Sequence, residues 1–224
     1  MTMEHDFEPV RGLPARPPAG ERILWQGSPT GKALARRAFH VRGVAIYFLV
    51  LMAWRAASNV ADGHGAVDTL LAVLGVLPLA LAGLGVLALL GWLNARATVY
   101  TITDRRVVMR FGVALPMTVN LPFTRIDAAG LAVHRDGTGD VTLTLLGSDR
   151  IAWLHLWPHV RPWHLARPQP MLRGLSNPQA VAGVLGNALQ AALAAVPAAD
   201  VADDARAPTR EPRQVRIPSA VMTG

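Results

Sequence analysis

The sequence predicts an α+β membrane protein in which two transmembrane helices precede an antiparallel β domain that one C-terminal helix closes. Three observations predict this class. Residues 70–93 contain no charged side chain, and short segments between residues 98 and 156 alternate between apolar and polar types. The chain has 224 residues and is 51% hydrophobic, a length and composition that allow two spans and one modest folded domain.

The first predicted region is a cytoplasmic Pro-rich segment over residues 1–38. Five prolines between residues 9 and 29 oppose regular helices and strand ladders, so we expect an extended lead-in. Residues 22–25 form a short apolar patch that could dock onto another part of the protein.

The second region, residues 39–95, is predicted to cross the membrane twice, with helices at about 41–61 and 70–93. The uncharged run of 24 residues would measure ~36 Å as a helix, enough to cross a ~30 Å hydrocarbon core. Arginine costs ~2.5 kcal/mol at the centre of a bilayer and less near an interface, so Arg55 is expected near an interface. Arginine and tryptophan near the span ends are the predicted membrane-anchoring residues: Arg42, Trp54, Arg55, Trp92 and Arg96.

Basic residues set the predicted orientation. Four of them lie on the N-terminal side of the first span and four on the C-terminal side of the second. The connecting loop contains one arginine and two aspartates, Asp62 and Asp68. Because cytoplasmic flanks carry the excess of Lys and Arg, both termini are expected in the cytoplasm and the short connecting loop on the outer side. The flanking residues are Lys32, Arg36, Arg37, Arg42, Arg96, Arg105, Arg106 and Arg110.

The third region, residues 96–196, is predicted to be a sandwich or partly open barrel of about six short strands. The strands are expected at residues 98–103, 106–111, 117–121, 125–133, 141–146 and 150–156. Asn177 and Pro178 are suited to begin a helix, and apolar residues then recur at helical spacing up to residue 192. Residues 197–224, rich in charge and proline, are predicted to be a disordered tail.

Composition and motifs argue against several classes of function. The net charge is +7, with 22 Lys and Arg against 15 Asp and Glu, which suits positive-inside bias and anionic lipid. Nucleic-acid binding would need a basic helix or an aromatic-basic sheet pattern, and neither is evident. Without cysteine, thiolate metal sites and cysteine nucleophiles are excluded. The sequence has no metalloprotease, serine hydrolase or phosphate-loop motif, so we expect no catalytic residues, no metal site and no enzymatic activity.

Tryptophan and histidine gather in residues 153–164: Trp153, His155, Trp157, His159, Trp163 and His164. Three interpretations stay open. These side chains could pack on the sheet or sit at the membrane interface, form a surface for a protein partner, or bind a tetrapyrrole or metal. A metal site usually has several convergent ligands, and no acidic residue lies between Arg150 and the tail. The predicted partner-binding residues are Trp157, His159, Arg161, Trp163 and Arg173.

Two sets of residues resemble known families. The bacterial pleckstrin-homology-like membrane proteins share residues 21–29 (ERILWQGSP) before the spans and 100–108 (YTITDRRVV) after them. Residues 157–163 (WPHVRPW), 170–173 (PMLR) and 7–14 (FEPVRGLP) make the chain similar, over about residues 5–195, to the photosynthetic complex assembly proteins of purple bacteria.

This resemblance implies a pleckstrin-homology-like β domain and a non-enzymatic factor that helps build the reaction centre and light-harvesting complex 1. The implied partners are reaction-centre subunits, core antenna polypeptides and membrane lipids. The implied location is the bacterial inner (intracytoplasmic) membrane, which the chain would cross more than once. No cofactor is expected, although His40 could contact bacteriochlorophyll instead of anchoring the span at the interface. The alternative is a general lipid- or protein-binding scaffold of the same fold, unrelated to photosynthesis; homo-oligomerisation stays open.

Two weaker features concern contacts with helices and lipids. Small residues recur along one side of the second span, at Gly75, Pro78, Ala82 and Gly85. Such a seam lets another helix approach closely, and the occupant is expected to be the first span or a client helix. Arg105, Arg106 and Arg110 are expected to contact anionic headgroups.

Overall fold

The computed structural model describes residues 11–13, 15–146, 152–194 and 219–221. The chain forms two compact units, one from residues 31–95 and the other from residues 1–30 together with 96–224. The predicted combination of apolar helices, an antiparallel β domain and a closing helix is confirmed.

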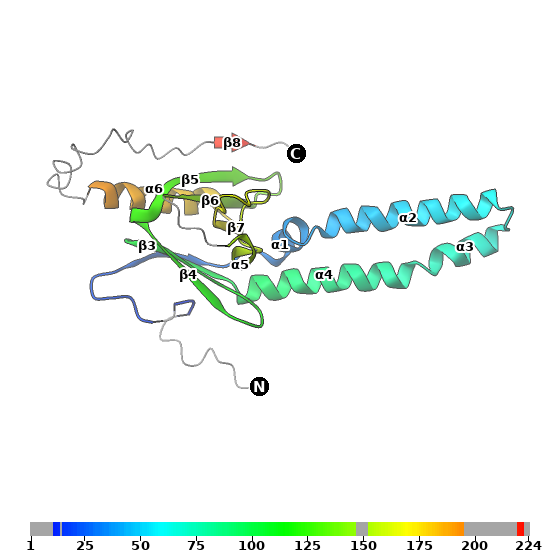
Figure 1. The fold of residues 1–224 in the computed structure, drawn as a ribbon, viewed down its shortest axis with the longest axis horizontal. Helices are drawn as coiled ribbons and strands as arrows, with labels where there is room; N and C mark the ends of the chain where they lie inside the picture. Colours follow the sequence, from blue (N-terminus) through cyan, green and yellow to red (C-terminus); the bar gives the residue numbers. More distant parts are fainter. Residues whose placement is uncertain (1–10, 14, 147–151, 195–218, 222–224) are drawn as a thin grey trace. The chain divides into compact units, whose positions relative to one another are not determined.

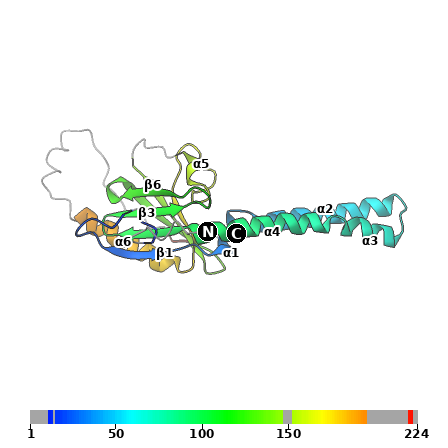
Figure 2. The ribbon, with the colours of Figure 1, turned by 90° about the horizontal axis from the view of Figure 1, so that it is seen from below.

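The helical unit consists of α1 (Gly31–Arg37), α2 (Val41–Ala61), α3 (Ala66–Leu74) and α4 (Leu77–Ala97). By length and composition, two helical stretches could cross a membrane: Val41–Ala61, and Ala66–Ala97 with a mean hydropathy of 2.5. The second stretch was expected to be one helix over 70–93, but in the structure it is divided into α3 and α4 at residues 75–76. Pro78 is the second residue of α4, near the helix start, where a missing N–H is tolerated. α2 and α4 run side by side (Figures 1 and 2).

The contact face of α4 differs from the small-residue seam that the sequence suggested. A Cβ built on Gly83 would lie 3.7 Å from the ring of Phe48 in α2, and Ala80 is buried. The expected seam is instead exposed along its whole length, at Gly75, Pro78, Ala82 and Gly85. The prediction that the first span occupies it is therefore wrong. Since α4 is apolar on every side, residue size alone could not identify its packing face.

Gly91 lets α1 lie directly on α4. A Cβ at Gly91 would come within 2.8 Å of the Cα of Ala35, and α1 contributes buried Leu34 to a small cluster with Ala95. We expect Gly91→Leu to displace α1 and destabilise the helical unit by about 2 kcal/mol, as overpacking does. Helical circular dichroism during thermal melting in detergent measures this. Gly85→Leu is the matched control, because a Cβ there meets nothing within 4 Å; equal melting of the two variants would contradict this packing.

The described residues of the β unit form two four-stranded sheets. The first has the order β1-β2-β3-β4 and the second the order β7-β6-β5-β8. The first sheet comprises β1 (Ile23–Gly27), β2 (Val99–Thr103), β3 (Arg106–Phe111) and β4 (Met117–Pro122). The second comprises β5 (Ile126–Val133), β6 (Gly139–Leu145), β7 (Met171–Leu175) and β8 (Ser219–Val221).

Strand β1 changes the predicted domain plan. The sequence suggested that residues 1–38 are a lead-in outside the domain, but β1 pairs antiparallel with β2, placing Gly27 opposite Tyr100 and Ile23 opposite Thr103. The helical unit is therefore inserted between two neighbouring strands of one sheet. The prolines around β1 argued against a strand there, and the residues that pair with β1 are more than seventy positions away in the sequence.

Two further predictions need correction. Residues 150–156 were expected to form a strand, but Trp153–Leu156 is a short helix, α5, and residues 147–151 lie outside the described residues. Ser219–Val221, expected within a disordered tail, pairs parallel with β5 as β8. The remainder of the predicted tail lies outside the described residues. Strands β2 to β6 lie within a few residues of the predicted positions.

Side chains in and beside strands β1, β2 and β3 join the two motifs of the pleckstrin-homology-like resemblance. Arg106 donates two hydrogen bonds to the carboxylate of Glu21, from Nε at 2.7 Å and from Nη2 at 2.8 Å. Burial works to raise the pKa of Glu21, but hydrogen bonds from Arg106 and Thr103 and the charge of Arg106 leave that pKa below its usual value. Gln26 Nε2 also donates to Thr101 Oγ1 at 2.9 Å.

One core fills the β unit. Its fully buried side chains come from the first sheet, the second sheet and α6 (Pro178–Ala194), as Ile102, Leu143 and Leu185 illustrate. The helix begins as predicted: Pro178 is its first residue, and Asn177 Oδ1 accepts a hydrogen bond from the Ala180 N–H at 3.4 Å. The side chains that face away from this core are the ones available to bind other molecules.

Candidate functional site

The predicted partner-binding residues divide into exposed and buried groups. Residues 152–170, here called the Trp segment, precede β7 and contain α5. Trp157, Arg161 and Trp163 are exposed in it. His159 is fully buried, and Arg173, in β7, is 7% exposed. The prediction that His159 and Arg173 contact a partner therefore needs correction, because neither side chain reaches the surface.

His159 fixes the Trp segment to the first sheet. Its Nδ1 lies 2.6 Å from the Tyr100 hydroxyl and its Nε2 lies 3.0 Å from Thr98 Oγ1. The short first distance indicates that Tyr100 donates to Nδ1, so a neutral imidazole carries its proton on Nε2 and donates it to Thr98. The imidazole also packs against Phe111, with ring centroids 5.0 Å apart. Burial raises the pKa of Tyr100 above its usual range, so its hydroxyl keeps the proton that it donates.

Arg173 and Asp140 extend this buried network through the backbone. Arg173 donates its N–H to the Tyr100 hydroxyl at 3.1 Å and its Nη1–H to the Pro158 carbonyl at 2.9 Å. Asp140 accepts the Gly174 N–H at 2.7 Å and lies 3.1 Å from His134 Nε2. The buried half of the WPHVRPW motif and the arginine of PMLR thus hold the Trp segment in place.

The buried imidazole makes the stability of the β unit depend on pH. Burial, helped by the charge of Arg173, lowers the pKa of His159 to about 3, whereas an unfolded histidine has a pKa of about 6.5. Between these values the unfolded state binds more protons, so stability is full above pH ~6.5 and falls as the pH decreases. We expect a slope of up to about 1.4 kcal/mol per pH unit in urea unfolding, and a smaller slope for His159→Gln. Equal slopes would contradict a buried neutral imidazole.

The outer side of the Trp segment carries large apolar side chains. Leu154, Trp157, Trp163 and Leu165 are between 41% and 93% exposed. Trp163 is the most exposed of them and has a φ of 62°, a conformation that is unfavourable for a bulky residue. The segment therefore holds a strained, solvent-facing indole beside other exposed apolar groups.

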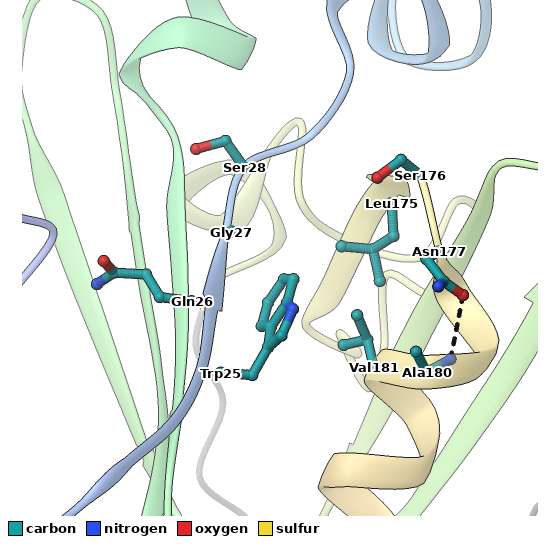
Figure 3. A pocket seen from close by; sticks show the side chains of 9 residues that line it. All are labelled: Trp25, Gln26, Gly27, Ser28, Leu175, Ser176, Asn177, Ala180 and Val181. Carbon is teal, nitrogen blue, oxygen red and sulfur yellow. Dashed lines mark hydrogen bonds between the residues drawn. The ribbon is translucent and has the colours of Figure 1, made fainter.

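A separate groove lies between β1 and the start of α6 (Figure 3). It encloses about 280 Å³ and is lined by Trp25, Gln26, Gly27, Ser28, Leu175, Ser176, Asn177, Ala180 and Val181. In Figure 3, Trp25 points across the gap toward Val181, whereas Gln26 points to the other side of β1. A Cβ on Gly27 would overlap the indole of Trp25, so this glycine allows the indole to lie against the strand.

The groove has the chemistry of a site for an extended, uncharged segment. None of its nine lining residues carries a charge, and α6 contains no charged residue. Within the described sheet order, β1 is the terminal strand, and an edge strand offers backbone groups for pairing with another chain. Sequence analysis missed this groove because β1 was not recognised; the apolar patch at residues 22–25 was its only signal.

The predicted membrane-anchoring side chains are all exposed: Arg42, Trp54, Arg55 and Trp92 in the helical unit, and Arg96 at the end of α4. His40 is exposed just before α2. Of the three arginines predicted to contact headgroups, Arg105 is exposed and Arg106 is bound to Glu21. Lipid contact by these residues stays a prediction. Among the described residues, no three or more His, Asp and Glu side chains gather as a metal site would require.

Comparison with known proteins identifies the family. Residues 40–189 match the family described as Bacterial PH domain. The chain is also 40% identical over 191 residues to a Rhodobacter capsulatus protein described as "Uncharacterized 23.7 kDa protein in puhA 5'region", covering 85% of this chain and 89% of that one. No solved structure matches. The predicted pleckstrin-homology-like fold is thus confirmed: the chain belongs to the bacterial PH domain family.

Proposed function

We propose that the protein is a membrane-anchored, non-enzymatic assembly factor for the photosynthetic reaction centre and light-harvesting complex 1. The observation that carries this proposal is the similarity to the Rhodobacter capsulatus protein, whose description places it in the 5' region of puhA, a reaction-centre gene. The sequence resemblance to assembly proteins of purple bacteria supports the same function. On this proposal the protein binds nascent subunits and needs no cofactor of its own.

The charges of the helical unit support an anchor in the inner membrane with both termini in the cytoplasm. Basic residues lie in α1, at the start of α2 and at the end of α4, as Lys32, Arg42 and Arg96 illustrate, whereas Asp62 and Asp68 lie at the α2–α3 end of the unit. Positive-inside bias then places the β unit, which holds both termini, on the cytoplasmic side. Nascent subunits and their pigments would reach the β unit from there.

The groove beside β1 is the surface that we propose for a client subunit. An extended apolar segment of the client would pair with the backbone of β1 and place side chains against Trp25 and Val181. The absence of charge from the lining disfavours acidic or basic segments, which would lose hydration without gaining a partner.

Co-purification of the tagged full-length protein from phototrophically grown cells tests this function. We expect reaction-centre or core antenna polypeptides with the native chain and few with Ala180→Arg, which places a charge in the groove. Gln179→Arg is the matched control, because residue 179 is exposed on the same helix but does not line the groove. Recovery of no photosynthetic polypeptide with any of these proteins would favour a general membrane scaffold of the same family.

A further inference from the structure

One end of the β unit is joined directly to α4. Helix α4 ends at Ala97 and β2 begins at Val99, so Thr98 alone separates them. His159 lies 3.0 Å from Thr98, which fixes the Trp segment at this end of the sheet. Val99 pairs with Arg110 near the end of β3. The turn between β3 and β4, residues 112–116, therefore lies at the same end.

Both segments at this end expose large apolar side chains. The β3–β4 turn presents Val113 and Leu115, which are 48% and 80% exposed. The Trp segment presents Leu154, Trp157, Trp163 and Leu165, with Trp163 at 93% exposure. These six residues are called the interfacial face below. Several large apolar side chains that are exposed at one end of a domain indicate a binding surface for protein or membrane.

The charges around the interfacial face favour lipid as the occupant. Neither the Trp segment nor the β3–β4 turn contains an acidic residue, and Arg110, Arg161 and Arg167 belong to these segments or adjoin them. Surfaces that lie in the headgroup region of anionic bilayers have this composition: tryptophan and leucine beside arginine, with no acidic side chains.

The covalent link between α4 and β2 also favours lipid as the occupant of the interfacial face. If α4 crosses the bilayer, Thr98 is the first residue after that span, and His159 binds the Trp segment to Thr98. A surface tethered so closely meets lipid at a high effective concentration. A bilayer also relieves the exposure of Trp163, whose strained backbone brings no described internal contact that would explain it.

We infer that the interfacial face inserts into the headgroup region of a bilayer that contains anionic phospholipid. This inference rests on the part of the proposed function that makes α2 and α4 membrane-spanning. It assigns the exposed tryptophans of the Trp segment to lipid and leaves the groove beside β1 for protein clients.

The test uses the absence of cysteine from the chain. Single-cysteine variants of the full-length protein at Leu115, Leu154 and Leu165 are labelled with an environment-sensitive fluorophore. They are reconstituted in phosphatidylcholine and phosphatidylglycerol that carry a spin label near the headgroup. We expect the fluorescence at all three positions to shift to the blue and to lose most of its intensity to the quencher. Labels at Leu165 should be quenched less without phosphatidylglycerol, because Arg161 and Arg167 then lose their anionic partners.

Two control positions show what a label outside the bilayer and a label within it report. Leu24 is an exposed leucine beside Ile23, which pairs with Thr103 at the far end of β2, and it should stay unquenched. Leu81 is exposed within α4 and should be quenched by lipid spin-labelled deep in the acyl chain. Labels at 115, 154 and 165 that behave like the label at 24, while the label at 81 is quenched, would overturn the inference. An unquenched label at 81 would instead refute the membrane-spanning helices themselves.

A protein occupant gives a different result. Labels at 154 and 165 would then stay unquenched in lipid alone and shift to the blue only after core complex is added. That outcome would overturn lipid binding in favour of a protein surface at the Trp segment.

Discussion

Replacing His159 by alanine is expected to destabilise the β unit by about 4 kcal/mol. The substitution removes the hydrogen-bond partner of the Thr98 and Tyr100 hydroxyls, which are both fully buried. Each hydrogen bond lost between buried groups costs about 0.5–1.5 kcal/mol, although Tyr100 still accepts the Arg173 N–H, and the lost imidazole volume adds a larger cavity cost. The Trp segment should also lose its attachment to Thr98, so fluorescence from the half-buried Trp153 should shift toward that of solvated indole.

Urea unfolding of detergent-solubilised protein, followed by β-sheet circular dichroism, measures the change. His155→Ala is the matched control, because His155 belongs to the same segment but is exposed; its effect should stay within about 0.5 kcal/mol. Similar losses for the two variants would mean that His159 is not the attachment point described above.

Replacing Arg106 by leucine is expected to cost about 3 kcal/mol, the second largest effect. Glu21 has a side chain that is only 2% exposed and holds Arg106 through two hydrogen bonds. Without the guanidinium, the Glu21 carboxylate loses its counter-charge and keeps only the hydrogen bond from Thr103, which is unfavourable for a buried charge. The pair joins the residues before the spans to those after them, so the loss should loosen β1 from β2.

Replacing the other member of the pair gives an internal comparison. Glu21→Leu should cost less than Arg106→Leu, because Arg106 is 27% exposed and its charge can still reach water. Arg105→Leu removes an exposed neighbouring charge and should change stability by less than about 0.5 kcal/mol. Urea unfolding of the three variants, with hydrogen exchange at β1, provides the measurement. Equal costs for Arg106→Leu and Arg105→Leu would contradict a structural role for the pair.

Local patterns made much of the fold predictable. Val141, Leu143 and Leu145 alternate with polar residues, and β6 forms there. The uncharged run at 70–93 likewise lies within the stretch occupied by α3 and α4. Asn177 and Pro178 marked the start of α6 correctly. Each of these signals depends on neighbours within one or two turns or on one strand.

The features that sequence analysis missed depend on distant partners. β7 is buried at every position, so it lacks the alternation that reveals a half-buried strand. His159 resembled a surface ligand among exposed histidines, whereas its partners Thr98 and Tyr100 lie about sixty residues earlier in the chain. β1 could be recognised only through its pairing with β2 across the inserted helices.

We propose that the protein supports assembly of the photosynthetic complexes. The most direct measurement is near-infrared absorption of membranes from a Rhodobacter capsulatus strain that lacks the similar protein, with and without this chain supplied from a plasmid. We expect the deletion to lower the assembled reaction centre and core antenna, and this chain to restore them. Normal absorption in the deletion strain would contradict an assembly function.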